Sequence, residues 1–509
     1  MTTGSSLIGH ITELAHSRCP DDPAFAGFVG DYLEDLPDLD RDERSAGDLL
    51  EAAWAHYEFG RVRNPGDTRV TVFTPDPRRD GWNWDRSFLF IVTDDRPFLV
   101  DSVRMALERC GVSTYLLVHP MLAVTRDDAG RITHTSAVTP QMLATPPGGG
   151  TTIEAWTQIE IDLCSPELAE RVADEVRAAV EAVQRAVDDF APMRERMAGL
   201  ADLDPLLAWF VDGQFVFLGA VTCDLPDGGE PVPRLESALG QLAAPGALGD
   251  RPDPPIDVDA RRAGQVVSVA RSAATATVHR AARMTVVTVF TTDAHGAPIA
   301  ERFHGLLAST VYRKSVLDIP SVGDRARAKL DLGTDGVATH ATRSIRNVLE
   351  SLPRDLVLEL DADPLADLVM AIVGLQERQI VRAFAVPEPV GTAATVLVYL
   401  PRSRFTAALA DQVAALVSEA YESPVRDVES WVGSSSLARI TVTVIDARPI
   451  DLDALSERID AATTAWIDRI AAAVRRAGQP SRTEIARKTG LSHSTISAIS
   501  ADLLAEGVL

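Results

Sequence analysis

The order of strand and helix patterns between Arg69 and Phe190 constrains the fold of this chain more than any other feature. A short strand pattern is followed by the apolar run SFLFIVTDD, which ends in two acids, and then by helical spacing from Pro97 to Gly111. A third strand from Ser113 to Asp127, a hairpin turn, an alternating strand and a long amphipathic helix with Ser165-Pro166 at its start complete the series. This order predicts a small α+β sandwich of the split βαβ kind.

The rest of the chain predicts several further domains, because 509 residues are too many for one hydrophobic core. Two later stretches alternate strands and helices in a similar way, and the last sixty residues change character. We expect a helical segment, three α+β modules of which the second carries a helical insertion, a linker helix and a separate tail. Their boundaries are residues 1–66, 67–195, 196–372, 373–448, 449–476 and 477–509.

Charge and composition exclude some classes of protein. The formal net charge of −24 makes the body of the chain a poor ligand for DNA or for anionic membranes. The sequence has no signal-peptide pattern and no run of about 18 apolar residues, so we expect a cytoplasmic protein without a membrane span. The four cysteines form no CxxC pair, which argues against a zinc site and fits reduced thiols.

The junction of the second strand with the first helix is a candidate ligand site. We expect an acid to cap this helix, with a proline early in its first turn. The unpaired N–H groups and the positive dipole at a helix start suit a carboxylate ligand. The segment resembles the D-R-P-G start of ACT domains, small βαββαβ (ferredoxin-like) modules that bind amino acids and regulate metabolic enzymes. The resemblance implies a small amino-acid effector and these candidate residues: Asp94, Asp95, Arg96, Pro97, Phe98 and Asp101.

One residue of this segment departs from the ligand-binding pattern. ACT domains that bind a ligand usually have glycine where this chain has Phe98, and glycine lets a ligand approach the backbone closely. A phenylalanine fills that space. Two interpretations therefore stay open: an effector site, or an ACT fold that is used only for packing or domain contact.

Three longer segments strengthen the resemblance. Residues 94–122, 277–312 and 377–406 are similar, in this order, to the N-terminal part of the large bacterial NAD-dependent glutamate dehydrogenases. The similarity runs from about Thr68 to about Ile470. It implies tandem ACT-like modules that precede a dehydrogenase domain, and for the full-length enzyme it implies oxidative deamination of glutamate to 2-oxoglutarate with NAD.

The catalytic machinery of that family has no counterpart in the sequence. Dinucleotide binding needs a glycine-rich turn from strand to helix, but Gly148–Gly150 lies in a loop rich in proline and threonine. None of the three lysines, Lys314, Lys329 and Lys488, stands in a glycine-rich setting. We expect a non-catalytic regulatory chain that binds no cofactor itself, NAD being implied only for the full-length enzyme. As partners we expect further copies of the chain or a dehydrogenase catalytic half. An alternative is that the chain is a non-catalytic scaffold for a dehydrogenase half that is encoded separately.

A few other residues could form a site. The histidines His279, His304 and His340, with Arg280, are more typical of structural residues beside strands than of a catalytic group. The pair Trp82 and Trp84 is more typical of a packed lid than of a stacking surface. The segment Arg302–Gly305 suggests an interface or hinge, in which Gly305 allows close backbone contact.

The tail suggests a different function. Residues 480–509 resemble the helix-turn-helix that opens ROK-type and MarR-type repressors, with Ala486, Gly490 and Ile496 at the expected spacing. This resemblance leaves open an amino-acid-responsive DNA-binding regulator, beside a merely structural helical hairpin. Arg482, Arg487 and Lys488 would contact phosphates, and the groove-facing candidates are Ser492, His493, Ser494, Thr495 and Ser497.

We predict that the whole chain binds DNA weakly or not at all. The negative body opposes the approach of DNA most strongly at low salt, and a single half-winged domain makes few phosphate contacts. An anisotropy titration against the DNA that flanks its own gene measures this. Tight, salt-sensitive binding that is lost when Ser494 and Thr495 are replaced by alanine would contradict the prediction and favour the regulator.

Overall fold

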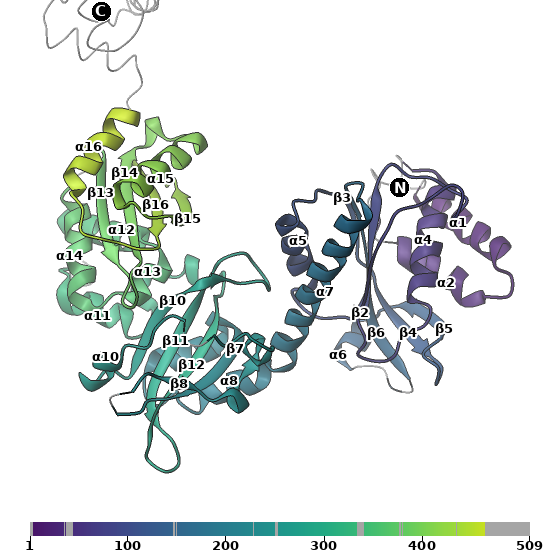
Figure 1. Cartoon of the computed structure of the whole chain (residues 1–509), viewed down its shortest axis with the longest axis horizontal. Helices are drawn as coiled ribbons and strands as arrows, with labels where there is room; N and C mark the ends of the chain where they lie inside the picture. Colours follow the sequence, from purple (N-terminus) through teal and green to yellow (C-terminus); the bar gives the residue numbers. More distant parts are fainter. Residues whose placement is uncertain are drawn as a thin grey trace, which may run out of the picture. The chain divides into compact units, whose positions relative to one another are not determined.

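The computed structural model describes residues 4–34, 36, 44–145, 148, 150–227, 229–249, 253–332, 340–375, 378, 380–433 and 435–463. The chain divides into two compact units, of which the first is formed mainly by residues 1–253 and 272–308 and the second mainly by residues 309–509 (Figure 1). Both units are α+β and contain antiparallel sheets, as expected. No helix in the described ranges is long and apolar enough to cross a membrane. The helix-turn-helix-like tail lies outside these ranges.

The first module is built on a six-stranded sheet in the order β1-β2-β6-β4-β5, with β3 also beside β6. The predicted strand from Ser113 to Asp127 is in fact two strands, β3 and β4, which are separated at Pro120. Proline has no N–H for a continuous ladder, and its carbonyl oxygen instead accepts a hydrogen bond from the backbone N–H of Trp156 at 3.0 Å. The strands are β1 (Arg69–Phe73), β2 (Ser87–Asp94), β3 (Thr114–Val118), β4 (Met121–Arg126), β5 (Ile132–Ala137) and β6 (Thr151–Ile161).

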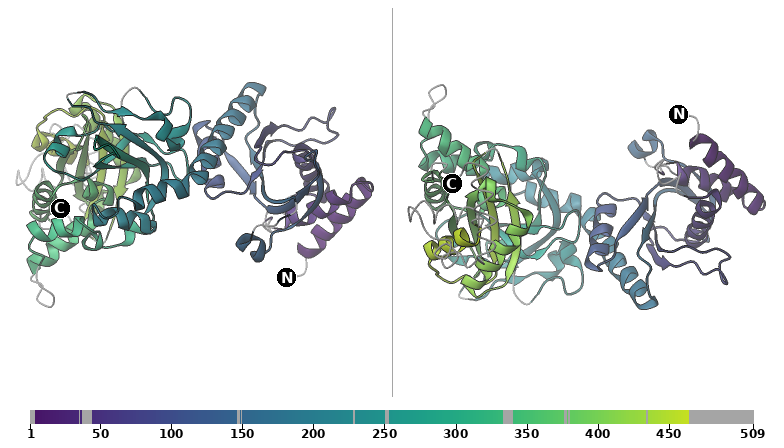
Figure 2. Two further views of the ribbon diagram at one scale, coloured as in Figure 1. Left: turned by 90° about the horizontal axis from the view of Figure 1, so that it is seen from below. Right: turned by 90° about the horizontal axis from the view of Figure 1, so that it is seen from above.

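Helices cover both faces of this sheet (Figure 2). On one face, α5 (Leu99–Arg109) and α7 (Pro166–Asp188) pack against Leu89 and Ile91. On the other, the expected N-terminal helices pack against Phe90 and Val92. Because both faces are covered, the strand β2 is a continuous apolar run rather than an alternating one. The N-terminal helices are α1 (Gly4–Arg18), α2 (Pro23–Leu33) and α4 (Ala46–Gly60), and the short α6 (Pro140–Ala144) precedes β6.

The third module repeats the strand arrangement of the first. Its sheet order is β13-β14-β16-β15, which corresponds to β1-β2-β6-β4. In a βαββαβ module, the edge position beside the first strand is taken by the last strand of the chain. Here that edge position is taken by β1 or β13, which precedes all other strands of its module. The expected order is therefore permuted in both modules. The elements are β13 (Arg382–Pro387), β14 (Ala394–Pro401), α15 (Ala407–Tyr421), β15 (Val425–Trp431), β16 (Leu437–Val444) and α16 (Leu452–Thr463).

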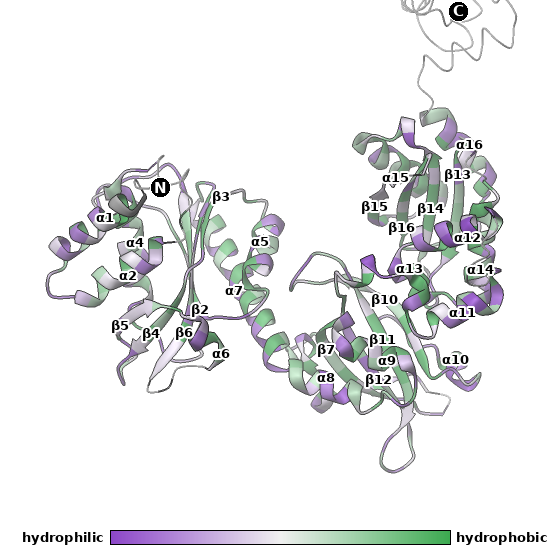
Figure 3. Cartoon of the chain, turned by 180° about the vertical axis from the view of Figure 1, so that it is seen from behind, coloured by the Kyte–Doolittle hydropathy of each residue, from purple (hydrophilic) through white to green (hydrophobic). Residues whose placement is uncertain are grey.

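The interior of the third module is apolar along its central strands. All residues of β14 and β16 are buried, and Figure 3 shows these strands as mainly hydrophobic. The predicted helical stretch before this module is also present in the second unit. It consists of α11 (Val322–Lys329), α12 (His340–Ser351), α13 (Arg354–Glu359) and α14 (Ala362–Val373).

The second module differs from the expected βαββαβ order. Its sheet runs β10-β11-β12-β7-β8 with β9 beside β7, and no helix separates β10, β11 and β12 along the chain. The register shifts at Gly305, where an added Cβ would lie 2.2 Å from the carbonyl oxygen of Val216, so the predicted close backbone contact is confirmed. The elements are α8 (Phe190–Ala198), α9 (Pro205–Trp209), β7 (Phe215–Asp224), β8 (Val232–Pro233), β9 (Leu239–Gly240), α10 (Val258–Arg262), β10 (Val267–Thr275), β11 (Arg283–Thr292) and β12 (Pro298–Leu307).

The helix α7 joins the first two modules. Its N-cap is Ser165, whose side chain accepts a hydrogen bond from the backbone N–H of Leu168 at 3.3 Å, as the sequence predicts. Val172 and Val176 pack in the first module, and further along the helix Val183 packs against the sheet of the second. The two sheets therefore share one helix.

A buried histidine in the first module gives a pH-dependent prediction. His56 on α4 is fully buried, is hydrogen-bonded with the hydroxyl of Tyr32 at 2.8 Å and stacks on Phe90. Burial lowers the pKa of His56 from 6.5 to about 3, so the folded state keeps the ring neutral. The unfolded chain regains the ordinary value and takes up a proton between these two pH values. The contribution of His56 to stability is thus fully present above pH 6.5 and is lost as the pH falls.

We expect the free energy of unfolding to fall by about 2 kcal/mol through His56 between pH 7.5 and pH 5. His56→Gln removes this titration and should flatten the dependence. Urea titrations that follow the fluorescence of Trp54 and Trp156 measure it, with exposed His16→Gln as the matched control. Equal slopes in His56→Gln and the parent chain would contradict the assignment.

Candidate effector site at the start of helix α5

The predicted ligand segment connects β2, which ends at Asp94, with α5, which begins at Leu99. The residue at the N-cap position is Phe98, with a left-handed backbone (φ 70°) and no side-chain capping bond. The expected acidic cap is therefore wrong, because Asp95 lies three residues before the cap position. A left-handed φ is unfavourable for a residue with a Cβ, so other contacts must hold this segment in place.

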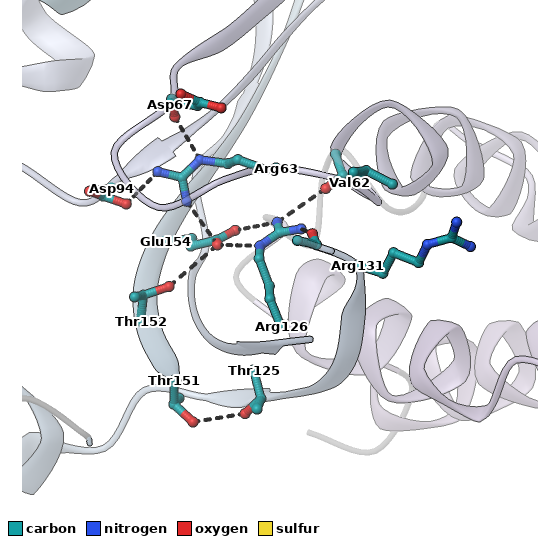
Figure 4. A network of polar contacts seen from close by, with 12 residues as sticks. Val62, Arg63, Asp67, Asp94, Thr125, Arg126, Arg131, Thr151, Thr152 and Glu154 are labelled. Atoms are coloured by element: carbon teal, nitrogen blue, oxygen red, sulfur yellow. Dashed lines mark hydrogen bonds and ion pairs between the residues drawn. The ribbon is translucent and has the colours of Figure 1, made fainter. Parts of the chain in front are cut away.

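A buried charge network fixes the beginning of the segment (Figure 4). Glu154 on β6 is paired with Asp94 in the strand register and is fully buried. Its carboxylate lies 2.8 Å from Nη1 of Arg63 and accepts a hydrogen bond from Nε of Arg126 at 2.7 Å. Arg63 also forms an ion pair with Asp94. Two guanidinium groups thus face two carboxylates, and each buried charge has a partner of opposite sign.

Two of the six predicted residues already form ion pairs, one with the network and one with α7. The carboxylate of Asp94 is held by Arg63, and Arg96 forms an ion pair with Asp188 at 2.9 Å. Asp95 is half-buried, whereas Pro97 and Asp101 are exposed. The six residues therefore lie together at the helix start, but Asp94 and Arg96 contribute to structure.

A turn of the second module covers Phe98. The ring of His279, which lies between β10 and β11, is 4.6 Å from the ring of Phe98, measured between centroids. The backbone N–H of His279 donates a hydrogen bond to Oγ of Ser102 at 3.2 Å, and this hydroxyl donates to the carbonyl oxygen of Phe98 at 2.7 Å. His279 also has a left-handed backbone (φ 75°). This contact is what the packing interpretation expects, and ligand binding at this position stays a prediction.

The electrostatic setting of His279 keeps its ring neutral. Burial, and next the charge of Arg280, lower the pKa of His279, whereas Asp101 raises it. A neutral ring packs against Phe98 without the cost of burying a charge.

The other histidines of interest do not join this site. His304 lies on β12 and lines a cavity in the second module, and His340 begins α12 in the second unit. Arg280 donates to the carbonyl oxygen of Leu307 at 2.8 Å. Among the residues that the structure describes, no group of three His, Cys, Asp or Glu side chains is arranged to hold a metal ion. The candidate DNA-binding residues, 482–497, lie outside the described part of the chain.

Sequence reasoning did not find Arg63, Arg126 or Glu154. Glu154 gave a signal that could have been used, because it stands two residues before the buried Trp156 in an alternating strand and so shares its face. A carboxylate on an inward face requires a cationic partner. The pair Trp82 and Trp84 was interpreted as packing, and both residues pack against Phe88.

Comparisons with known proteins agree with this arrangement. Three family models match the chain: "Glutamate dehydrogenase, ACT1 domain" at residues 28–176, "Glutamate dehydrogenase, helical motif 1" at 319–378 and "Glutamate dehydrogenase, ACT2 domain" at 382–467. NAD-specific glutamate dehydrogenases of Halomonas elongata and Pseudomonas aeruginosa are 28% and 29% identical over 91% and 84% of this chain. That of Mycobacterium tuberculosis is 24% identical over 88% of it.

The chain is similar to the N-terminal region of the large NAD-specific glutamate dehydrogenases. It spans about 30% of the length of these relatives. The ACT1 match contains the Glu154 network and the start of α5, the helical-motif match contains α11–α14, and the ACT2 match contains the third module. The sheet of the second module, from β7 to β12, lies outside all three matches.

Removing the central carboxylate should destabilise the ACT1 module. Glu154→Gln leaves the positive charges of Arg63 and Arg126 buried without the negative charge of Glu154 to balance them. We therefore expect a loss of about 3–5 kcal/mol in the free energy of unfolding. Asp174→Asn is the matched control, because it removes an exposed carboxylate 2.6 Å from Arg177, and exposed pairs contribute little. Urea unfolding followed by tryptophan fluorescence measures both, and equal effects would show that the network is not a stabilising centre.

Proposed function

We propose that this chain is the regulatory and oligomerisation portion of an NAD-specific glutamate dehydrogenase that acts in the cytoplasm. In this proposal a dehydrogenase portion binds NAD and carries out the oxidative deamination of glutamate to 2-oxoglutarate, and this chain binds neither. The observation that carries the proposal is the succession along one chain of the ACT1, helical-motif and ACT2 matches of the same family.

The contacts of the first module support a regulatory role. Phe98 in the ACT1 module packs against His279 in the second module, and α7 packs in both. An amino-acid effector at the start of α5 would displace the His279 turn, because that turn now covers the helix start. Effector binding would then change the contact between two modules, and a differential contact of this kind is what regulation between sites requires.

The two alternatives differ in their partners. As a scaffold, the chain would bind a dehydrogenase half that is encoded separately. As a DNA-binding regulator it would depend on residues 477–509, which lie outside the described part of the chain. The net charge of −24 opposes this second alternative.

Turnover measurements test the proposal directly. The purified full chain should reduce no NAD with glutamate above a host-extract control. Added to a Pseudomonas aeruginosa relative that lacks the matching segment, it should co-elute on size exclusion and change the glutamate concentration that gives half-maximal rate. Heat-unfolded chain is the control. Turnover by the chain alone, or a dehydrogenase that neither binds it nor changes its kinetics, would contradict the proposal.

A further inference from the structure

The sheet of the third module has a polar cleft on the face opposite its apolar core. Asp427 of β15 is the register partner of Thr443 on β16, which in turn is the partner of Thr395 on β14. Glu429 and Thr441 form the next row of partners on β15 and β16. Residues two apart on a strand point to the same face, so these polar side chains share one face of the sheet. All residues that line the cleft belong to the second unit.

Two hydroxyl groups in the cleft have no hydrogen-bond partner. Thr443 is 2% exposed and Thr441 is 7% exposed, and within the described part of the chain neither side-chain hydroxyl forms a hydrogen bond. Buried polar groups without a partner are rare in folded proteins and require an explanation. Both residues line the cleft, so a ligand that donates hydrogen bonds to these two oxygens provides one.

The carboxylates of the cleft create a negative potential. Among the residues that the structure describes, no arginine or lysine lies within ion-pair distance of Asp427 or Glu429. Partial burial, and next the charges of Asp427 and Asp355, raise the pKa of Glu429. Arg271 and Arg439 lower this pKa, each by less than either acid raises it. The net effect of the surrounding charges on Glu429 is therefore that of an excess of carboxylates.

The positive charge of Arg271, which also lines the cleft, is already balanced. Its guanidinium donates to both carboxylate oxygens of Glu359, from Nε at 2.6 Å and from Nη2 at 3.0 Å. Nη2 also lies 3.8 Å from the carboxylate of Glu388 and donates to Oγ1 of Thr395 at 2.9 Å. Two buried carboxylates thus face this arginine, so it does not neutralise the acids of β15.

The size of the cleft limits what can enter it. Its enclosed space is about 10 Å³, which is the room of one water-sized group. The ammonium head of a primary amine has about this size and three N–H donors. In the described ranges these carboxylates belong to no group of three that could hold a metal ion. Pro353 and Leu356, at the start of α13, add an apolar wall for the carbon chain of such an amine.

We propose that this cleft binds the ammonium group of a small primary amine that carries no carboxylate. The ammonium group donates to the hydroxyls of Thr441 and Thr443 and faces the carboxylates of β15, while its carbon chain lies against Pro353 and Leu356. A carboxylate on the ligand would be repelled by the acids of the cleft, so amino acids are poor ligands. The site is separate from the start of α5.

The expected affinity is modest. A ligand of about five or six non-hydrogen atoms at a site that is open to solvent should have a dissociation constant between about 0.1 and 10 mM. Added salt should weaken binding, because it screens the carboxylates. Amine binding does not rest on the proposed function and is measured on the chain alone. Its failure is therefore distinct from a failure to regulate a dehydrogenase.

Ligand-observed NMR on the full chain at constant ionic strength tests the inference with four probes of similar length. Butylamine and 1,4-diaminobutane should bind saturably, and the stronger of the two identifies a monoamine or a diamine as the source. Binding of 4-aminobutanoate should be about tenfold weaker or less, because of its carboxylate. Butyltrimethylammonium keeps the charge but has no N–H donor and a larger head, so it should not compete. No saturable binding of either amine, or equal binding of butyltrimethylammonium, would overturn the proposal.

Three variants locate the site. Glu429→Gln should weaken the binding of butylamine about tenfold, and Thr443→Val, which removes a hydroxyl at nearly constant volume, about fivefold. Glu457→Gln on α16 is the matched control, because it removes an exposed carboxylate outside the cleft and should bind as the parent chain does. Circular dichroism establishes that each variant is folded. If Thr443→Val fails to fold, Glu429→Gln decides, and unchanged binding in either folded variant would refute the site.

Discussion

The buried carboxylate of Glu154 is the interaction on which the first module depends. It holds Arg126 of β4 and Arg63, which follows the N-terminal helices, and Arg126 also donates to the carbonyl oxygens of Gly60 and Gly130. Gly130 must be glycine, because a Cβ there would lie 2.6 Å from the carbonyl oxygen of Arg63 and its φ is 74°. One carboxylate therefore joins the N-terminal helices, the β4–β5 hairpin and the centre of the sheet, and through Arg63 it also orients Asp94 at the end of β2.

After Asp94, the backbone at the start of α5 adopts an unfavourable left-handed conformation. Contacts from the second module stabilise this conformation. Phe98 and His279 both adopt left-handed conformations, which cost about 1 kcal/mol or more each in residues with a Cβ. The packing of their rings and the two hydrogen bonds of Ser102 offset this cost. The equivalent helix of the third module needs no such help, because Thr406 caps α15 by accepting from the N–H of Leu409 at 3.2 Å. The two ACT-like modules share a strand order but differ in what closes the helix.

Local patterns predicted most elements, because hydrophobic spacing and capping residues act within a few positions. Ser165 at the start of α7 and Gly305 on β12 are examples. The permuted strand order was not predictable, because nothing in the sequence of β1 specifies that it pairs beside β2. Within the candidate site the six residues of the helix start could be found because they lie within one short segment of the sequence, 94–101. Their partners Arg63, Glu154 and His279 were not, because these lie far away in sequence and only the sheet register and the packing of the second module bring them near.

The cavity of the second module and the start of α5 are connected through β12 and β11. His304 lines the cavity, and Leu306, two residues further along the same strand, packs in the cluster that contacts Phe98. Met284 belongs to both, since it lines the cavity and packs against the same cluster. Packed side chains of this kind have few alternative arrangements, so the position of Met284 and the surface on which Phe98 rests depend on each other. A few side chains therefore connect the buried His304 with the left-handed start of α5, and these side chains come from strands far from α5 in the sequence, which local sequence preferences do not bring together.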